Sequence, residues 1–284
     1  MRGARKNLIM LCLFLSSSLI TYGIEVDLKI SGALSYMNLN HINRSLNGWE
    51  ACIKNAGHGY EAGSFREGDV ENFHLGTAFE GEFLFYLSSH LAVGAGTGYT
   101  YGELPEKKTA LTVDRANDTY IYVRPVKINA FPLNLSAYYF FPLREKLKLF
   151  IRAGMGFSWV KYVEREGLEV SEDNYSFYWD QKASAQGLNY FTGLGLTYEP
   201  DPFFRFFMEG EAELAEISQF QGKTAEGEKA TLFFFEEHYP DLEFWRANNL
   251  LLKEEPSGEN FRSVQKTVVD MSSFSVKIGV IIKF

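Results

Sequence analysis

Apolar residues occupy every second position along most of residues 24–284, and this alternation predicts β-strands. Between Ile24 and Tyr36 one parity is apolar, whereas the other carries Glu25, Asp27 and Lys29. The same two-residue period returns in seven later segments, near residues 73–86, 91–101, 126–139, 148–159, 189–198, 204–214 and 273–284. Helical periodicity is almost absent. The pattern therefore predicts an all-β fold with eight long strands.

The segments between these strands alternate in length. Residues 87–90, 142–146 and 199–202 are short, whereas the connections near 41–71, 103–119, 164–186 and 221–267 are long and polar. Short turns at one end and long loops at the other are typical of an up-and-down transmembrane β-barrel. An even number of strands places both chain ends at the short-turn, periplasmic side. We thus expect an eight-stranded antiparallel barrel with four long extracellular loops.

The predicted strands carry apolar faces and many aromatic residues. Several strands exceed the roughly 9–11 residues that a tilted membrane crossing needs. The fourth strand changes parity at Phe131-Pro132, and a proline within a strand suggests a β-bulge. Rings near the strand ends suggest two interfacial girdles, namely Phe85, Tyr86, Tyr139, Phe141, Tyr198, Phe203 and Phe284 near the turns, and Tyr99, Tyr101, Tyr120, Tyr122, Trp159, Tyr162 and Phe220 near the loops. The alternative is a soluble lipocalin-like barrel, which turns its apolar face inward.

The first 23 residues have the composition of a secretory signal peptide. Arg2, Arg5 and Lys6 precede an apolar stretch from Leu8 to Leu15, which is followed by small residues. We therefore expect residues 1–23 to be removed and residues 24–284 to form the barrel domain, with Cys52 as its one cysteine. The formal net charge of −8 argues against nucleic acid as a partner.

The last strand carries a more specific signal. It ends on Phe284 with apolar residues at alternate positions before it, as the assembly signal of bacterial outer-membrane barrels does. This ending and the strand-like unit of residues 126–141 resemble the broad outer-membrane β-barrel family that contains OmpA-, OmpX- and OmpW-like proteins. The resemblance implies the outer membrane of a Gram-negative-type bacterium, contact with its lipid, and recognition of the C-terminal strand by the barrel assembly machinery. It assigns no single activity and no subfamily.

Charged residues on the inward parity define a candidate network in the lumen. The set is Asp27, Lys29, Glu80, Glu82, Lys127, Lys148, Arg152, Arg205, Glu209, Glu211, Glu213, Lys277 and Lys283. Buried charges are unfavourable unless they pair or contact water. The network therefore either closes the lumen with ion pairs or lines a polar pathway. Glycines on three strands leave room for water or for long side chains from across the barrel. The three alternate glutamates of residues 209–213 are spaced too widely to share one metal ion, so no metal site is assigned.

The longest loop, residues 221–267, is the candidate lid or binding element. Asp241 and Pro256 suggest the start and the stop of a short helix with Leu242, Trp245, Asn249 and Leu252 on one face. The candidate lid or binding residues are Phe233, Phe234, Phe235, Tyr239, Leu242, Trp245 and Leu252. Another loop, near residues 164–186, is both acidic and aromatic. Either loop could serve binding, because binding residues concentrate on loops held by a rigid scaffold.

The histidines do not predict a catalytic set. A lipid-modifying enzyme would need serine, histidine and an acid together, but His41 and His74 have no suitable serine beside them in the sequence. We therefore expect a monomeric, non-enzymatic, structural or surface-binding barrel, without catalytic residues, cofactor or metal. The alternative is a narrow channel for small or hydrophobic solutes, gated by residues 221–267. A lipid-modifying enzyme is the third hypothesis.

Overall fold

The computed structural model describes residues 25–56, 63–115, 118–170, 175–224, 226–240 and 243–284, so the predicted signal peptide lies outside the described residues. Antiparallel strands dominate the fold, which confirms the all-β prediction. Among the described residues, no helix has the length and apolar character needed to cross a membrane.

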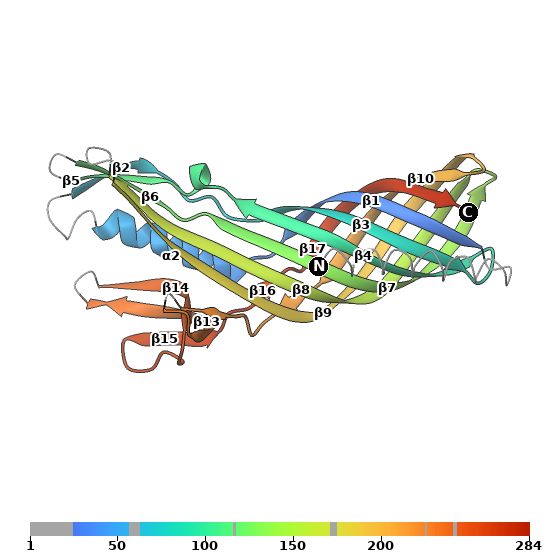
Figure 1. Cartoon of the computed structure of the whole chain (residues 1–284). Helices are drawn as coiled ribbons and strands as arrows, with labels where there is room; N and C mark the ends of the chain where they lie inside the picture. The colour runs from blue at the N-terminus through green and yellow to red at the C-terminus, as the bar shows by residue number, and fades with distance from the viewer. Residues whose placement is uncertain (1–24, 57–62, 116–117, 171–174, 225, 241–242) are drawn as a thin grey trace.

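A closed ring of antiparallel strands forms one half of the molecule (Figure 1). Each ring strand pairs with the next one along the chain, and the last pairs with the first. The ring strands are β1 (Val26–Met37), β3 (Leu75–Tyr86), β4 (Leu91–Leu104), β7 (Val126–Arg144), β8 (Leu147–Val170), β9 (Tyr175–Asp201), β10 (Phe204–Leu214) and β17 (Ser273–Lys283). Asp27 lies opposite Lys283, at the end of the ring that also carries the three short turns.

Three ring strands continue far beyond the others. β7, β8 and β9 have 19, 24 and 27 residues, whereas β1 has 12. The segment near residues 164–186 is therefore mostly a β8–β9 hairpin rather than a loop. Its edge is extended by β6 (Asp118–Val123), β5 (Leu111–Arg115) and β2 (Gly63–Gly68) in turn. A short 3-10 helix, η1 (Glu106–Lys108), connects β4 to β5.

A folded body, which we term the lobe, surrounds these strand extensions. It adds helix α2 (Asn40–Ala56) and the strands β11 (Glu216–Ile217), β12 (Gln221–Lys223), β13 (Lys229–Tyr239), β14 (Phe244–Leu252), β15 (Phe261–Lys266) and β16 (Val269–Asp270). Figure 1 places α2 between the β2–β5–β6 edge and the β13–β15 strands. A Cβ on Gly48 would lie 2.7 Å from the backbone nitrogen of Ala247, so glycine permits the close contact between α2 and β14.

The prediction that residues 41–71 form a polar loop is wrong for α2. Leu39, Ile42, Leu46 and Trp49 recur at helical spacing and are almost fully buried. Because polar residues lie between them, the hydropathy pattern alone does not reveal this apolar face of the helix. The burial of this face against the lobe explains why the segment folds.

The helix expected over residues 241–254 is also wrong. Residues 244–252 form strand β14, which pairs with β13 in a continuous register from Thr231–Leu252 to Tyr239–Phe244. Ala247, Asn249 and Leu251 are buried on one face of the strand, and Asn248 on the other face is buried as well. Asp241 and Leu242 lie outside the described residues.

The bulge expected at Phe131-Pro132 is absent, since Phe131 pairs with Trp159 and Pro132 with Ser158 in an unbroken register. Even-numbered positions of β7 thus face inward throughout, and Val126, Ile128 and Ala130 are buried. What changes along β7 is the interior itself, which is polar within the ring and apolar within the lobe.

Candidate functional site

The inside of the ring is built in layers, beginning with charged residues at the short-turn end. Arg205 lies 2.9 Å from Glu199 and 3.3 Å from Asp27, and it donates a 2.6 Å hydrogen bond to the Tyr86 hydroxyl. Lys283 pairs with Glu199 at 2.8 Å. These contacts link β1, β9, β10 and β17 across the opening of the ring.

An aromatic layer lies directly above this rim. It consists of buried inward-facing side chains from five strands, namely Leu84, Tyr138, Phe140, Phe150, Phe207 and Ile281. A Cβ on Gly195 would lie 2.3 Å from Phe150 Cζ, so the glycine makes room for that ring. The ring glycines therefore admit large side chains from neighbouring strands, one of the two possibilities that the sequence left open.

A lumenal ion-pair network lies above the aromatic layer. Its members are Lys29, Glu80, Glu82, Arg152, Glu209, Glu211 and Lys277. The network thus sets three cations against four carboxylates, all contributed by ring strands.

Arg152 is the centre of this network. It lies 2.7 Å from Glu211 and 3.2 Å from Glu82, and it also pairs with Glu80. Its side chain is fully buried. A buried guanidinium needs several acceptors around it, and the surrounding carboxylates supply them to its two terminal nitrogens.

Two lysines complete the lumenal ion-pair network. Lys29 pairs with Glu209 at 2.6 Å and lies 4.6 Å from the centre of the Phe207 ring, so it joins the network to the aromatic layer. Lys277 pairs with Glu80 at 2.6 Å and with Glu211 at 2.8 Å. Charge and aromatic packing thus fill consecutive levels of the lumen.

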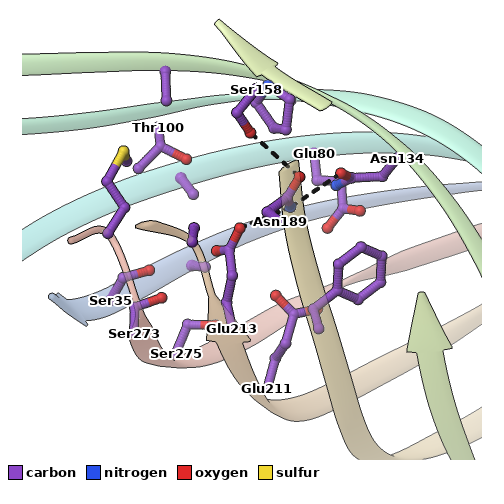
Figure 2. A pocket seen from close by; sticks show the side chains of 18 of the residues that line it. Ser35, Glu80, Thr100, Asn134, Ser158, Asn189, Glu211, Glu213, Ser273 and Ser275 are labelled. Carbon is purple, nitrogen blue, oxygen red and sulfur yellow. Dashed lines mark hydrogen bonds between the residues drawn. The ribbon is translucent and has the colours of Figure 1, made fainter. Parts of the chain in front are cut away.

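A small cavity of about 50 Å³ with both polar and apolar side chains in its lining lies above the network. Figure 2 shows Ser35, Ser273 and Ser275 around it, together with Glu211 and Glu213. Glu213 accepts a 2.8 Å hydrogen bond from Asn189. A water molecule needs at least about 10–15 Å³ of such space, so the cavity has room for only a few.

The three glutamates of β10 each bind protein side chains, and Arg152 lies near both Glu209 and Glu211. Glu209 binds Lys29, Glu211 binds Lys277 and Arg152, and Glu213 binds Asn189. Within the described ranges, no group of three or more His, Cys, Asp or Glu side chains is arranged to hold a metal ion.

Two residues that were predicted to belong to the lumenal network do not join its ion pairs. Lys127 is exposed and pairs with Glu103 at 2.7 Å, so its assignment to the lumen is wrong. The unshifted register of β7 turns it outward. Lys148 is half-buried near the rim, and no ion pair of the described residues includes it.

Several aromatic residues do not lie where the girdles were predicted. Tyr86 binds Arg205 in the rim rather than facing outward. Tyr162 and Phe220 are almost fully buried in the hydrophobic core of the lobe. Trp159, in contrast, is 45 % exposed on the outer face of β8.

The phenylalanines of the candidate lid form part of the lobe interior. Phe233, Phe234 and Phe235 are no more than 5 % exposed. The Phe234 ring stacks on His41 of α2 at a centroid distance of 4.6 Å. Tyr239 donates to Glu237, Trp245 lies beside His238, and Leu252 is half-buried. Phe234 thus holds the β13–β15 strands against α2, and Phe235 packs on Phe261 of β15.

A buried polar cluster joins the parts of the lobe, and sequence reasoning missed it. Arg124 pairs with Glu164 and donates to the Ser45 hydroxyl at 3.1 Å. Burial opposes its charge, but the nearby Glu164 and Glu166 carboxylates, together with Tyr162, outweigh this and raise the pKa of Arg124. Glu164 also accepts a 2.5 Å hydrogen bond from Tyr162. The cluster therefore ties α2 to β8.

The histidines considered for catalysis have structural contacts. His41 accepts a 3.2 Å hydrogen bond from the Val268 backbone, and His74 contacts the Met37 carbonyl at 3.1 Å. Among the described residues, neither histidine forms a hydrogen bond with a serine hydroxyl. Ser89 does contact His90, at 2.8 Å, but in an exposed turn.

The aromatic layer and the Arg124 cluster are the main features that sequence reasoning missed. Leu84, Phe140, Phe150 and Phe207 share the inward parity of the charged residues, and that signal could have revealed the layer. The Arg124 cluster draws on segments far apart in the chain, and no local pattern indicates it.

No protein-family model and no curated protein sequence matches the chain. Two similar solved structures are Neisserial surface protein A (NspA) and Ail, the attachment invasion locus protein of Yersinia pestis, solved with the heparin analogue sucrose octasulfate. NspA has a TM-score of 0.38 and 12 % identity over 92 % of this chain and 97 % of its own. Ail has a TM-score of 0.37 and 11 % identity over 92 % and 99 %.

A third similar structure is a mutant of the monoaromatic hydrocarbon channel TodX, with a TM-score of 0.20 and 6 % identity over 92 % of this chain and 90 % of its own. NspA and Ail are small outer-membrane β-barrel proteins, the class that the sequence resembles. The scores and identities are too low to carry any function from these proteins to this chain.

Proposed function

We propose that the ring is an eight-stranded transmembrane β-barrel of a Gram-negative-type outer membrane. Its outer face supports this proposal, because large apolar side chains there are exposed, among them Leu34, Phe79 and Leu135 at 62–68 %. Such a surface is unfavourable in water but suits hydrocarbon. Both chain ends then lie on the periplasmic side, and Phe284 is available to the assembly machinery.

We further propose that the protein is a closed, non-enzymatic barrel that anchors an extracellular lobe. The filled lumen is the observation that carries this function. The aromatic layer and the lumenal ion-pair network occupy consecutive levels, and the cavity above them is only about 50 Å³. The lobe has its own core and an exposed hairpin tip with Tyr175 and Phe177. This arrangement supports a structural or surface-binding role, with the lobe as the part that meets partners.

Conductance of refolded residues 24–284 in a planar bilayer tests the proposal. We expect no steps from the wild type, nor from a variant without residues 225–262, because both lumenal layers remain. The triple variant F150A/R152A/F207A is the positive control and should conduct. Conductance steps from the wild type would disprove a closed barrel. Conductance steps that appear when only residues 225–262 are removed would support the gated channel instead.

A further inference from the structure

Four lysines surround a hollow on the outside of the molecule. Lys161 of β8, Lys182 of β9, Lys223 of β12 and Lys229 of β13 are exposed and line a shallow depression of about 640 Å³. Strand pairing brings them together, because Lys161 lies opposite Ser184, Gln221 opposite the same serine, and Lys223 opposite Lys229. We call these four residues the lysine patch.

Most of the positive charge of the lysine patch is not neutralised by acidic side chains. Asp180 is the acid that lines the same hollow, and it already lies 2.7 Å from Arg165 and 3.1 Å from Lys182. Among the described residues, no ion pair includes Lys161, Lys223 or Lys229. The whole chain has a formal net charge of −8, so this local positive excess runs against its composition.

An apolar hollow of about 180 Å³ adjoins the lysine patch on the side of the ring. Phe131 and Trp159 line it, and Lys161 and Ser184 belong to both hollows. Lys161 follows Trp159 by two residues on the same face of β8, which is roughly 7 Å along a strand. The exposed ring of Trp159 and the exposed ammonium group of Lys161 therefore follow one another along β8. In the proposed barrel this direction crosses the membrane surface.

The apolar hollow followed by the lysine patch matches a charged lipid, in which apolar acyl chains are followed by a charged headgroup. Acyl chains would lie against Trp159, Phe131 and the apolar face below, while several ammonium groups would surround an anionic group at headgroup height. Lysine ammonium groups bind phosphate as point charges, and basic clusters beside a membrane attract anionic lipids. A protein partner would not need the adjoining apolar hollow at membrane level.

We propose that the lysine patch binds the headgroup of a phosphate-bearing lipid in the leaflet beside the lobe. This inference rests on the proposed transmembrane barrel, which places Trp159 at the interface. The site would hold the lobe in a fixed orientation on the membrane, because the patch spans ring strands β8 and β9 and lobe strands β12 and β13.

Spin-labelled lipids provide the test. The refolded protein is inserted into phosphatidylcholine vesicles containing a trace of labelled phosphatidic acid or labelled phosphatidylcholine, and the immobilised fraction is measured. We expect roughly tenfold preference for phosphatidic acid at low salt, since each lysine near the headgroups contributes roughly fivefold at most. The variant K161Q/K182Q should lower the preference to within about twofold of unity.

A matched control is K146Q/K266Q, which removes the same charge from two exposed positions away from the patch, one in the β7–β8 turn and one on β15. It should keep the wild-type preference. An unchanged preference in K161Q/K182Q, or an equal loss in the control, would overturn the proposal. Displacement of labelled phosphatidic acid by inorganic phosphate, but not by sodium chloride of equal ionic strength, would show that free phosphate is the ligand, and the lipid proposal would also fall.

The same experiment separates this inference from the proposed function. A protein that does not insert and immobilises neither label contradicts the transmembrane barrel itself. A protein that inserts and immobilises both labels equally keeps the barrel and removes the lipid site.

Discussion

The ring and the lobe share strands but have opposite distributions of polar and apolar residues. On β8, Arg152 faces inward among carboxylates and its neighbour Ile151 is 44 % exposed. Ten residues further, Tyr162 faces inward within a hydrophobic core, whereas Lys161 is exposed. The backbone pattern is unchanged between the two points. In the proposed transmembrane barrel, the difference lies in the solvent outside, because hydrocarbon favours apolar residues on the outer face and water favours polar ones.

The largest effect should come from the polar interior of the ring. Among the described residues, replacing Arg152 with methionine leaves Glu82 without a cation and leaves Glu80 and Glu211 with Lys277 alone. We therefore expect a loss of about 3–5 kcal/mol in the free energy of unfolding. Urea unfolding in vesicles measures it. Arg165→Met is the control, because its pair with Asp180 is exposed and should contribute at most about 1 kcal/mol. Similar losses in both variants would contradict a buried network.

The apolar interior of the lobe should respond differently. Phe234→Ala creates a cavity beside His41, and we expect a loss in the lower part of the range of about 3–5 kcal/mol. The lobe should become protease-sensitive while the ring keeps the heat-modifiable mobility of a folded barrel on gels. Phe177→Ala, at the exposed tip of the hairpin, should leave both measurements unchanged. Joint unfolding of ring and lobe would show that they form one cooperative unit.

The outer faces provide the next comparison. Leu135→Lys places a charge on the apolar face of the ring and should destabilise the inserted protein by about 2–4 kcal/mol. Ser64→Lys places the same charge on exposed β2 of the lobe and should change stability by less than about 0.5 kcal/mol. Equal tolerance of the two substitutions would mean that the ring is not surrounded by lipid.

Local alternation was enough to predict the ring. Residues such as Glu80, Glu82 and Lys277 lie on strands whose parity is read directly, so the sequence places them on one face without knowledge of their partners. It could not specify that Arg152 of β8 meets Glu211 of β10, because strand pairing and the diameter of the ring decide that contact.

The lobe was harder to predict for a physical reason. Its interior is apolar, so the rule that inward positions are polar fails there and misplaces Lys127 and Tyr162. Short elements such as α2 and β14 also depend on tertiary burial more than on local propensity. Leu46 and Leu251 read as scattered apolar residues in polar segments until the fold brings them into one core.

The smallest expected effect is a pH dependence of the stability of the lobe, which arises from His41. Burial, together with the nearby charge of Arg44, lowers the pKa of His41, and Asp270 opposes this change. The folded lobe therefore binds fewer protons at His41 than the unfolded chain does. The contribution of neutral His41 to stability is complete above the unfolded pKa of about 6.5 and is lost as pH falls below it.

We therefore expect the lobe to become more protease-sensitive as pH falls from about 7 to about 5, across the unfolded pKa of histidine. The His41→Gln variant should be less stable at neutral pH but should lose this part of the pH dependence. A wild-type lobe that gains stability on acidification would show that the interaction with Asp270 outweighs burial. If the protease sensitivity of His41→Gln changes with pH as in the wild type, the pH dependence belongs to other groups. The stacking of His41 on Phe234 is then a packing contact that does not depend on the charge of His41.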